Sequence, residues 1–279
     1  MITAEPMPDP SSLSPPAPRG ADGRRHLAAA TKGWFVATVL GQLLFASFVL
    51  LYYYPPTLSG NFAAWNAKPL ITGHVAGDLA GNRQFAIHVL AAATMTLLGL
   101  VQLVPAIRAR WPVAHRWSGR LFMALAALLA LGGLWLVWVR GSYLTINGAL
   151  AISIDALLIL AFGTQAWRTA RRRDFAAHRR WAQRTFIAAS AVWFMRVGYI
   201  AWGLSTGGAG IAKGMAGPFD YVWAYATYLL PLALLELYFR AERGTPPARK
   251  WMAAGLWLGT AIILSGSLGA WFAMWMPYL

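Results

Sequence analysis

The sequence predicts an all-α integral membrane protein, a bundle of seven transmembrane helices with its N-terminus inside and its C-terminus outside. Three observations lead to this prediction. Of the 279 residues, 58% are hydrophobic and 12% are charged, whereas soluble domains carry about 25% charged residues. The apolar residues form runs that are long enough to cross a bilayer. The basic residues lie between those runs, mostly on one side of the membrane.

The first 31 residues differ from the rest of the chain. They contain six prolines, several serines and few large apolar residues, which predicts a disordered cytoplasmic tail over 1–31. The rest, 32–279, is expected to form one membrane domain. The first apolar run starts too late for a cleavable signal peptide, is too long, and is not followed by a small-residue cleavage site. We therefore expect it to remain in the membrane as a span.

Seven apolar runs qualify as spans, because a bilayer core of about 30 Å needs about 20 helical residues. They are expected to be helices, since backbone polar groups in hydrocarbon must be satisfied within the segment. The alternating pattern of a membrane barrel strand is absent. The runs are 34–54, 85–106, 117–139, 147–167, 184–203, 221–239 and 251–275.

The orientation follows from the distribution of Lys and Arg, which are enriched in cytoplasmic segments. With the N-terminus inside, 19 of the 24 basic residues fall in inner segments. Arg196 lies within the fifth span, and the outer segments hold Lys68, Arg83, Arg140 and Lys213. This bias alternates correctly over all seven spans, which favours the predicted count and direction.

Composition also excludes several kinds of site. The chain has no cysteine, so it has no disulfide, no thiolate nucleophile and no thiolate-bound zinc or iron–sulfur cluster. The net charge of +15 would suit nucleic acid, but the basic residues lie next to membrane spans, so no nucleic-acid partner is expected. We find no Ser-His-Asp, His-Glu-x-x-His or acidic metal motif, and assign no catalytic residue.

One short phrase occurs twice in the chain. PVAHRWSGRLF at 112–122 and FAAHRRWAQRTF at 175–186 share Ala-His-Arg, a Trp, a later Arg and a Phe. Their histidines, His115 and His178, lie at the inner starts of the third and fifth spans. Spans two–three and four–five therefore resemble two copies of one hairpin. The sequence leaves duplication and convergence on the same interfacial anchors both open.

With these phrases, the chain resembles a family of bacterial membrane proteins known as domain of unknown function 2306. The resemblance covers roughly 84–203 and implies a multi-span bacterial inner-membrane protein, with no activity attached. It rests on His88, on His115-Arg116-Trp117 with Gly119-Arg120, on His178-Arg179-Arg180-Trp181 with Arg184, and on Arg196.

The inner cluster has three interpretations. The N-terminal end of a helix and nearby arginines disfavour positive charge, so both histidines are expected to be neutral, the form that binds metal. They could thus ligate the iron of a b-type haem, with arginines on its propionates. The alternatives are helix-end anchoring in the headgroup region and a site for anionic lipid headgroups or phosphate. The residues concerned are His115, Arg116, Arg120, His178, Arg179 and Arg184.

A second cluster is predicted in the outer half of the bundle. His88, Asp155 and Arg196 lie on spans two, four and five at depths that agree within about one turn. Ionisable residues within spans normally face the bundle interior and a partner, so we expect an Asp155–Arg196 ion pair that His88 could join. This cluster could fix helix packing, or line a pocket that binds a small polar or quinone-like ligand or passes protons. Alternatively, the charges face separate water pockets.

Two further features lie in the last two spans. Glu236 is expected to pair with Arg240 or a loop arginine, or else to orient His178 or close a cytoplasmic gate. Pro231 is expected to kink the same helix. In the last span, Gly255, Gly259, Gly266 and Gly269 form a small-residue face that suits close packing within the bundle or between copies of the chain.

Two functional hypotheses follow. The leading one is an inner-membrane protein with a polar site inside the bundle, which binds or transports a small ligand. The alternative is a membrane redox protein with bis-histidine b-type haem, linked to quinone.

Overall fold

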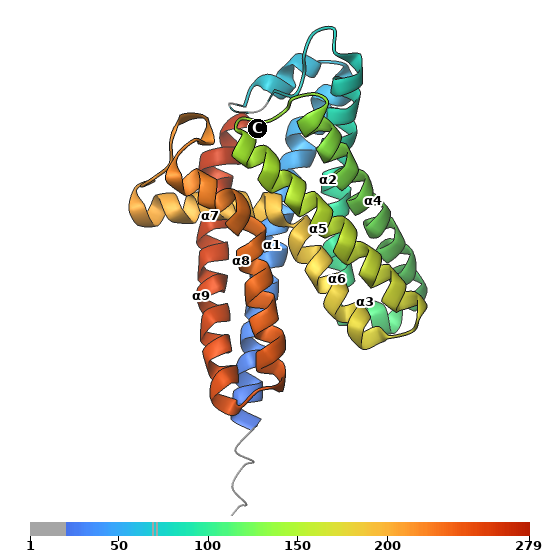
Figure 1. The fold of residues 1–279 in the computed structure, drawn as a ribbon, viewed down its shortest axis with the longest axis vertical. Helices are drawn as coiled ribbons and strands as arrows, with labels where there is room; N and C mark the ends of the chain where they lie inside the picture. Colours follow the sequence, from blue (N-terminus) through green and yellow to red (C-terminus); the bar gives the residue numbers. More distant parts are fainter. Residues whose placement is uncertain (1–20, 69, 71) are drawn as a thin grey trace, which may run out of the picture.

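The computed structural model describes residues 21–68, 70 and 72–279, and its elements are helices joined by loops (Figure 1). The long helices alternate in direction along the bundle. The elements are α1 (Ala21–Ser59), η2 (Phe62–Asn66), α2 (Leu79–Leu103), α3 (Pro105–Arg110), α4 (Pro112–Trp138), α5 (Ile146–Arg171), α6 (Phe175–Ala189), α7 (Ala191–Thr206), η3 (Lys213–Met215), α8 (Pro218–Arg243), α9 (Pro246–Ala270), η4 (Trp271–Trp275) and η5 (Met276–Tyr278).

Six of these helices are long and apolar enough to cross a membrane. A seventh span exists if α6 and α7 count as one, and these two meet at an angle of 56°. The fifth span expected over 184–203 is therefore a broken pair of helices that begins earlier, at Phe175. The break falls at Ser190, whose hydroxyl donates to the carbonyl of Phe186 at 2.8 Å. Serine that bonds back in this way bends helices.

The first helix begins earlier than the sequence suggests. Residues 21–31, expected to be part of a disordered tail, belong to α1, while 1–20 lie outside the described residues. The reason is tertiary packing, since Leu27 is buried in a small cluster with Ala241 of α8 and Met252 of α9. The membrane domain therefore includes a helical turn or more that composition alone assigned to the tail.

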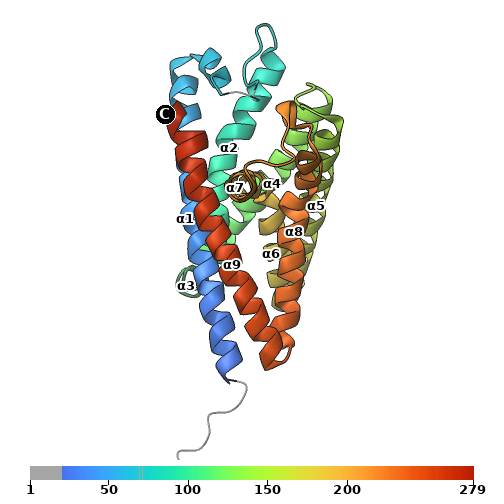
Figure 2. The ribbon, with the colours of Figure 1, turned by 90° about the vertical axis from the view of Figure 1, so that its left-hand side faces the viewer.

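Helices α1 and α9 run side by side in the same direction over most of their length (Figure 2). Helices α2 and α4 form one hairpin, and α5 and α6 form another. Helix α7 lies across the others near mid-height (Figure 1). We call the end that carries the α5–α6 and α8–α9 turns the arginine-rich end, and the end that carries 60–78, 139–145 and 207–217 the opposite end.

The small-residue face of α9 packs mainly inside the molecule. Side chains at Gly266 and Gly269 would collide with Val197 and Ile200 of α7, and Gly259 lies next to Trp34 of α1. Only Gly255 of this face has open space around it. The close packing expected from the sequence thus occurs within the bundle.

Candidate functional site

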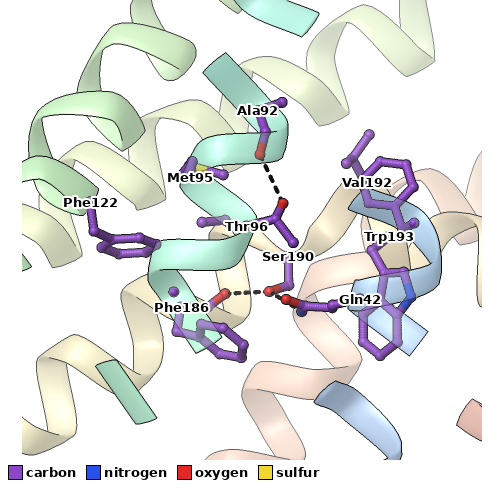
Figure 3. A pocket seen from close by; sticks show the side chains of 12 residues that line it. Gln42, Ala92, Met95, Thr96, Phe122, Phe186, Ser190, Val192 and Trp193 are labelled. Carbon is purple, nitrogen blue, oxygen red and sulfur yellow. Dashed lines mark hydrogen bonds between the residues drawn. The ribbon is translucent and has the colours of Figure 1, made fainter. Parts of the chain in front are cut away.

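The break between α6 and α7 adjoins a small enclosed cavity of about 30 Å³ (Figure 3). Its walls come from α1, α2, α4 and both halves of the broken span. The lining residues are Gln42, Phe45, Ala92, Met95, Thr96, Gly99, Phe122, Phe186, Ala189, Ser190, Val192 and Trp193. Since one water needs at least about 10–15 Å³ of such volume, the cavity has room for about two waters.

Three polar side chains face this cavity. The amide of Gln42 donates to the hydroxyl of Ser190 at 2.9 Å, which joins α1 to the break (Figure 3). The hydroxyl of Thr96 donates to the carbonyl of Ala92 at 2.9 Å. Gln42 is 2% exposed, and its side-chain amide carries both a donor and an acceptor, so it is a natural contact for a polar ligand in the cavity.

Other polar atoms without hydrogen-bond partners lie on the neighbouring turns. Trp193 and Ser267 both approach Gly41, which precedes Gln42, and Thr38 lies one turn before Gln42 on α1. Within the described residues, the indole nitrogen of Trp193 and the hydroxyls of Ser267 and Thr38 are buried without a hydrogen-bond partner. The interior around the break is therefore more polar than its aromatic surroundings suggest.

The predicted ion pair between Asp155 and Arg196 does not form. Arg196 donates to the carbonyl of Val192 at 2.6 Å, and its guanidinium lies 5.2 Å from the ring centre of Phe45 on α1. One oxygen of Asp155 is buried without a partner among the described residues. The physical reason is the break, because α7 turns away from the line of α6 and carries Arg196 toward α1.

His88 joins neither of these residues. Its ring packs on α4, beside Gly132 and Gly133, and its Nδ1 has no partner within the described part of the chain. The three members of the predicted outer cluster therefore face three different helices. They match the alternative in which the charges miss each other.

The two repeated histidines, His115 and His178, both lie at the arginine-rich end, near the starts of α4 and α6. Their imidazoles interact electrostatically. Nδ1 of His178 lies 2.9 Å from the carbonyl oxygen of Ala166, a bond that leaves Nε2 free as an acceptor. Nδ1 of His115 is buried and has no partner in the described structure. Arg116 and Arg120 are exposed beside them.

Glu236 pairs with Arg184 of α6, at 2.6 Å, rather than with Arg240 or His178. A second ion pair, between Arg179 and Glu242 at 2.9 Å, links the same two helices. Glu242 also accepts a hydrogen bond from Tyr238 at 3.0 Å. Sequence reasoning missed the second pair, although the antiparallel order of α6 and α8 brings both acids opposite arginines.

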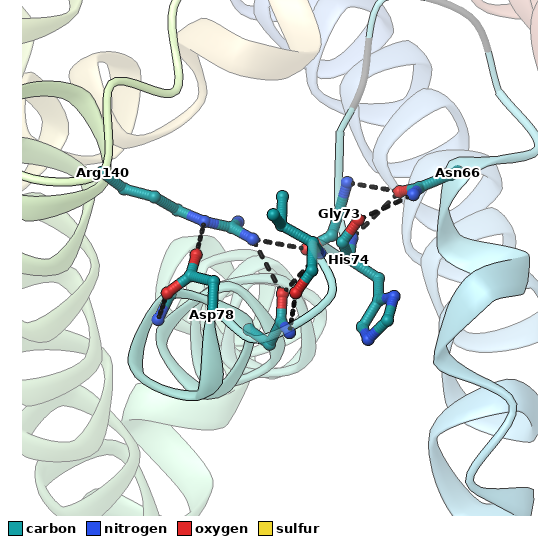
Figure 4. Close-up of polar contacts among 8 residues, drawn as sticks. Asn66, Gly73, His74, Asp78 and Arg140 are labelled. Carbon is teal, nitrogen blue, oxygen red and sulfur yellow. Dashed lines mark hydrogen bonds and ion pairs between the residues drawn. The ribbon is translucent and has the colours of Figure 1, made fainter.

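A polar network at the opposite end was also missed (Figure 4). Arg140, which follows α4, donates to Asp78 and to Asn82, both at 2.8 Å, and to the carbonyl of Gly73 at 3.1 Å. The backbone N–H of Gly81 and then the Arg140 guanidinium hold the pKa of the Asp78 carboxyl below its ordinary value. This network ties the loop before α2 to the end of α4. The one sequence signal was Asp78 at the N-cap of α2.

Lys68 in the same loop region is buried as well. Its ammonium donates to the carbonyl of Met274 at 2.6 Å and lies 4.7 Å from the ring centre of Tyr278. Burial, and then the charge of Arg196, lower the pKa of the Lys68 amine to about 8. No local pattern in the sequence indicates that Lys68 is buried, because an outer-loop lysine normally stays in water.

No group of three or more His, Asp or Glu among the described residues is placed to hold a metal ion. A family model described as "Predicted membrane protein (DUF2306)" matches residues 85–238, just over half of the chain. This match extends the resemblance seen in the sequence through α8. No curated protein and no solved structure matches the chain.

Proposed function

We propose that this chain, which belongs to the family of predicted membrane proteins DUF2306, is a bacterial inner-membrane protein. We also propose that it binds a small polar ligand at the break in its fifth span. The observation that carries the proposal is the hydrogen bond from Gln42 to Ser190 at the wall of an enclosed cavity. Membrane proteins tolerate a broken helix where it lines a cavity or is buried in protein. Many transporters bind their ligand at such breaks near the middle of the bilayer.

The cavity sets the size of the ligand. A volume of about 30 Å³ suits a water, or a polar molecule of about that size, and excludes a quinone from the closed conformation. The acceptor oxygen of Gln42 and the hydroxyl of Ser190 favour a ligand that can donate a hydrogen bond. The break is the natural hinge by which the cavity opens, since the two halves of the span are joined at one residue.

We propose the orientation that the basic residues favour, with the arginine-rich end in the cytoplasm. The exposed arginines there support contacts with anionic lipid headgroups. Arg120, for example, is exposed and lies 4.7 Å from the ring centre of Trp117, an arrangement suited to the headgroup layer. Reporter-enzyme fusions to the C-terminus should be active only outside the cytoplasm, and cytoplasmic activity would reverse the orientation.

The ligand site is tested with single cysteines, because the natural chain has none. Ser190→Cys should react with a small water-soluble methanethiosulfonate in native membranes, since the cavity must open for a ligand to enter. The matched control is Thr185→Cys, at a position near the end of the same helix. Both side chains are buried, Thr185 at 0% and Ser190 at 7% exposure. Thr185 lies outside the cavity and should stay unlabelled. Equal unreactivity of both cysteines would contradict the proposal. Small solutes that slow labelling at 190 then identify the ligand class.

A second candidate function, b-type haem binding, is favoured by the placement of His115 and His178 at one end of the bundle, where they interact electrostatically, and by the free Nε2 of His178. Neither the cavity at the break nor the open pocket beside Phe162 and Trp181 is lined by these histidines. Purified protein, made with ample haem supply, should then show a Soret band that His115→Ala and His178→Ala both remove. A featureless spectrum would leave the pair as a helix-end feature.

A further inference from the structure

The interface between α5 and α8 holds an acid that the proposed ligand site does not use. Asp155 lies about two turns into α5 from the opposite end, and is half-buried. One of its carboxyl oxygens is buried with no hydrogen-bond partner, and no Lys, Arg or His of the described chain forms an ion pair with it. An unpaired acid within a span costs at least ~2.5 kcal/mol, so this position needs a counter-charge or a proton.

A second oxygen without a hydrogen-bond partner lies on α8, on the other side of the interface from Asp155. Tyr228 is 1% exposed, and its hydroxyl has no partner among the described residues. The two side chains are close enough for the phenol and the carboxyl to interact electrostatically. Two unpartnered oxygens from different helices, one of them acidic, form the kind of oxygen site that hard cations prefer.

Polar groups continue from this pair toward the opposite end. Tyr225 lies one turn before Tyr228 on the same face of α8 and interacts with it. The Tyr225 hydroxyl reaches the carbonyl of Asn147 at 3.5 Å, and the Asn147 amide donates to the carbonyl of Tyr221 at 3.2 Å. Polar groups therefore lie along the α5–α8 interface between the opposite end of the bundle and Asp155.

We propose that Asp155 and Tyr228 form a binding site for a small monovalent cation, a proton or Na⁺, reached from the opposite end of the bundle. The titratable group of α8 that interacts with Asp155 is the phenol of Tyr228, and Tyr225 interacts in turn with Tyr228. The charge that α4 brings to that end, Arg140, is bound to Asp78, and no charged residue of α6 lies beside the outer half of α5. The bound cation therefore neutralises the acid without help from a basic side chain.

The test is labelling by a hydrophobic carbodiimide, which adds to a protonated carboxylic acid and is found on the peptide by mass spectrometry. Asp155 should be labelled in native membranes, and labelling should fall as pH rises. The matched control is Asp220, a buried acid of α8 that accepts hydrogen bonds from Tyr199, Gly217 and Ala212 at 2.8–3.0 Å. Because its oxygens are satisfied as a carboxylate, Asp220 should stay unlabelled under the same conditions.

Sodium distinguishes the two cations. If Na⁺ is the ligand, added NaCl should slow labelling of Asp155 where choline chloride does not. Tyr228→Phe should then raise the Na⁺ concentration needed by about tenfold, since it removes one oxygen ligand. If the proton is the ligand, both salts should act alike and only pH should matter.

A second measurement covers the case in which the reagent cannot reach the site. Melting of the purified wild type should respond to acid or to Na⁺, and Asp155→Asn, which is neutral, should lose that response. Absence of labelling at Asp155, together with identical responses of wild type and Asp155→Asn, would overturn the proposal. These outcomes do not depend on whether a ligand enters at Ser190.

Discussion

The two ends of the bundle hold their charges in different ways. At the arginine-rich end, most arginines are exposed, and the ion pairs Arg184–Glu236 and Arg179–Glu242 keep at least one partner well exposed. At the opposite end, the charges are few, and two of the cations are drawn into the protein: Lys68, and Arg140, whose side chain is 6% exposed. Charges at the first end therefore suit orientation and the membrane surface, whereas those at the second end hold loops onto helices.

The largest effect is expected where a cation is buried. Arg140→Gln leaves Asp78 without its ion pair and removes bonds to Gly73 and Asn82, so unfolding in detergent should become easier by about 2–4 kcal/mol. Arg83→Gln, at the same end but exposed, is the control and should change stability by less than about 0.5 kcal/mol. If both variants lost similar amounts of unfolding free energy, the Arg140 ion pair would contribute no more than an exposed arginine at the same end.

A second effect comes from Lys68 and depends on pH. Its folded-state pKa of about 8 lies below the ordinary value of 10.5, so between these pH values the unfolded chain binds more protons. Wild-type stability should therefore rise as pH increases from 8 to 10.5, by the order of 2 kcal/mol. Lys68→Met should lose this rise, and Lys213→Met, at an exposed lysine, should keep it. If stability changes with pH in the same way in Lys68→Met and in wild type, the Lys68 amine is not buried in the folded protein.

The smallest effect is expected at the arginine-rich end. Glu236→Gln should cost about 0.5–1 kcal/mol, because the side chain of Glu236 is 43% exposed and water screens the pair. Thermal melting at low and high salt measures this, since screening should also reduce the wild-type advantage. A loss as large as that of Arg140→Gln would mean that the two ends are alike.

The spans could be predicted because each apolar run is long and the basic residues between runs alternate in number. The break at Ser190 could not be predicted, since the surrounding stretch contains neither Pro nor Gly. This is why Asp155 and Arg196 were paired wrongly, because the break carries Arg196 toward α1. The signal for the break lies in tertiary contacts, above all the bond from Gln42, 148 positions earlier in the chain.

The residues of the candidate site also differ in how far the sequence could predict them. His115 and His178 were placed at one end from the repeated phrase, and in the structure both lie near helix starts at the arginine-rich end. Gln42 and Ser190 belong to no recognisable motif, and Lys68 and Arg140 look like ordinary loop residues in the sequence. Their roles depend on burial by helices that are distant in the sequence, and this burial cannot be predicted from the residues around each position.

The side-by-side packing of α1 and α9 has a consequence for biosynthesis. Helix α1 packs along most of its length on α9, so it meets this neighbour only when the chain has been made as far as α9. Hairpins α2–α4 and α5–α6 can close earlier, whereas the apolar face of α1 must wait, in contact with lipid or an insertion chaperone. The α1–α9 interface is therefore expected to close late, and a nascent chain stalled before α9 should expose α1 to membrane proteases.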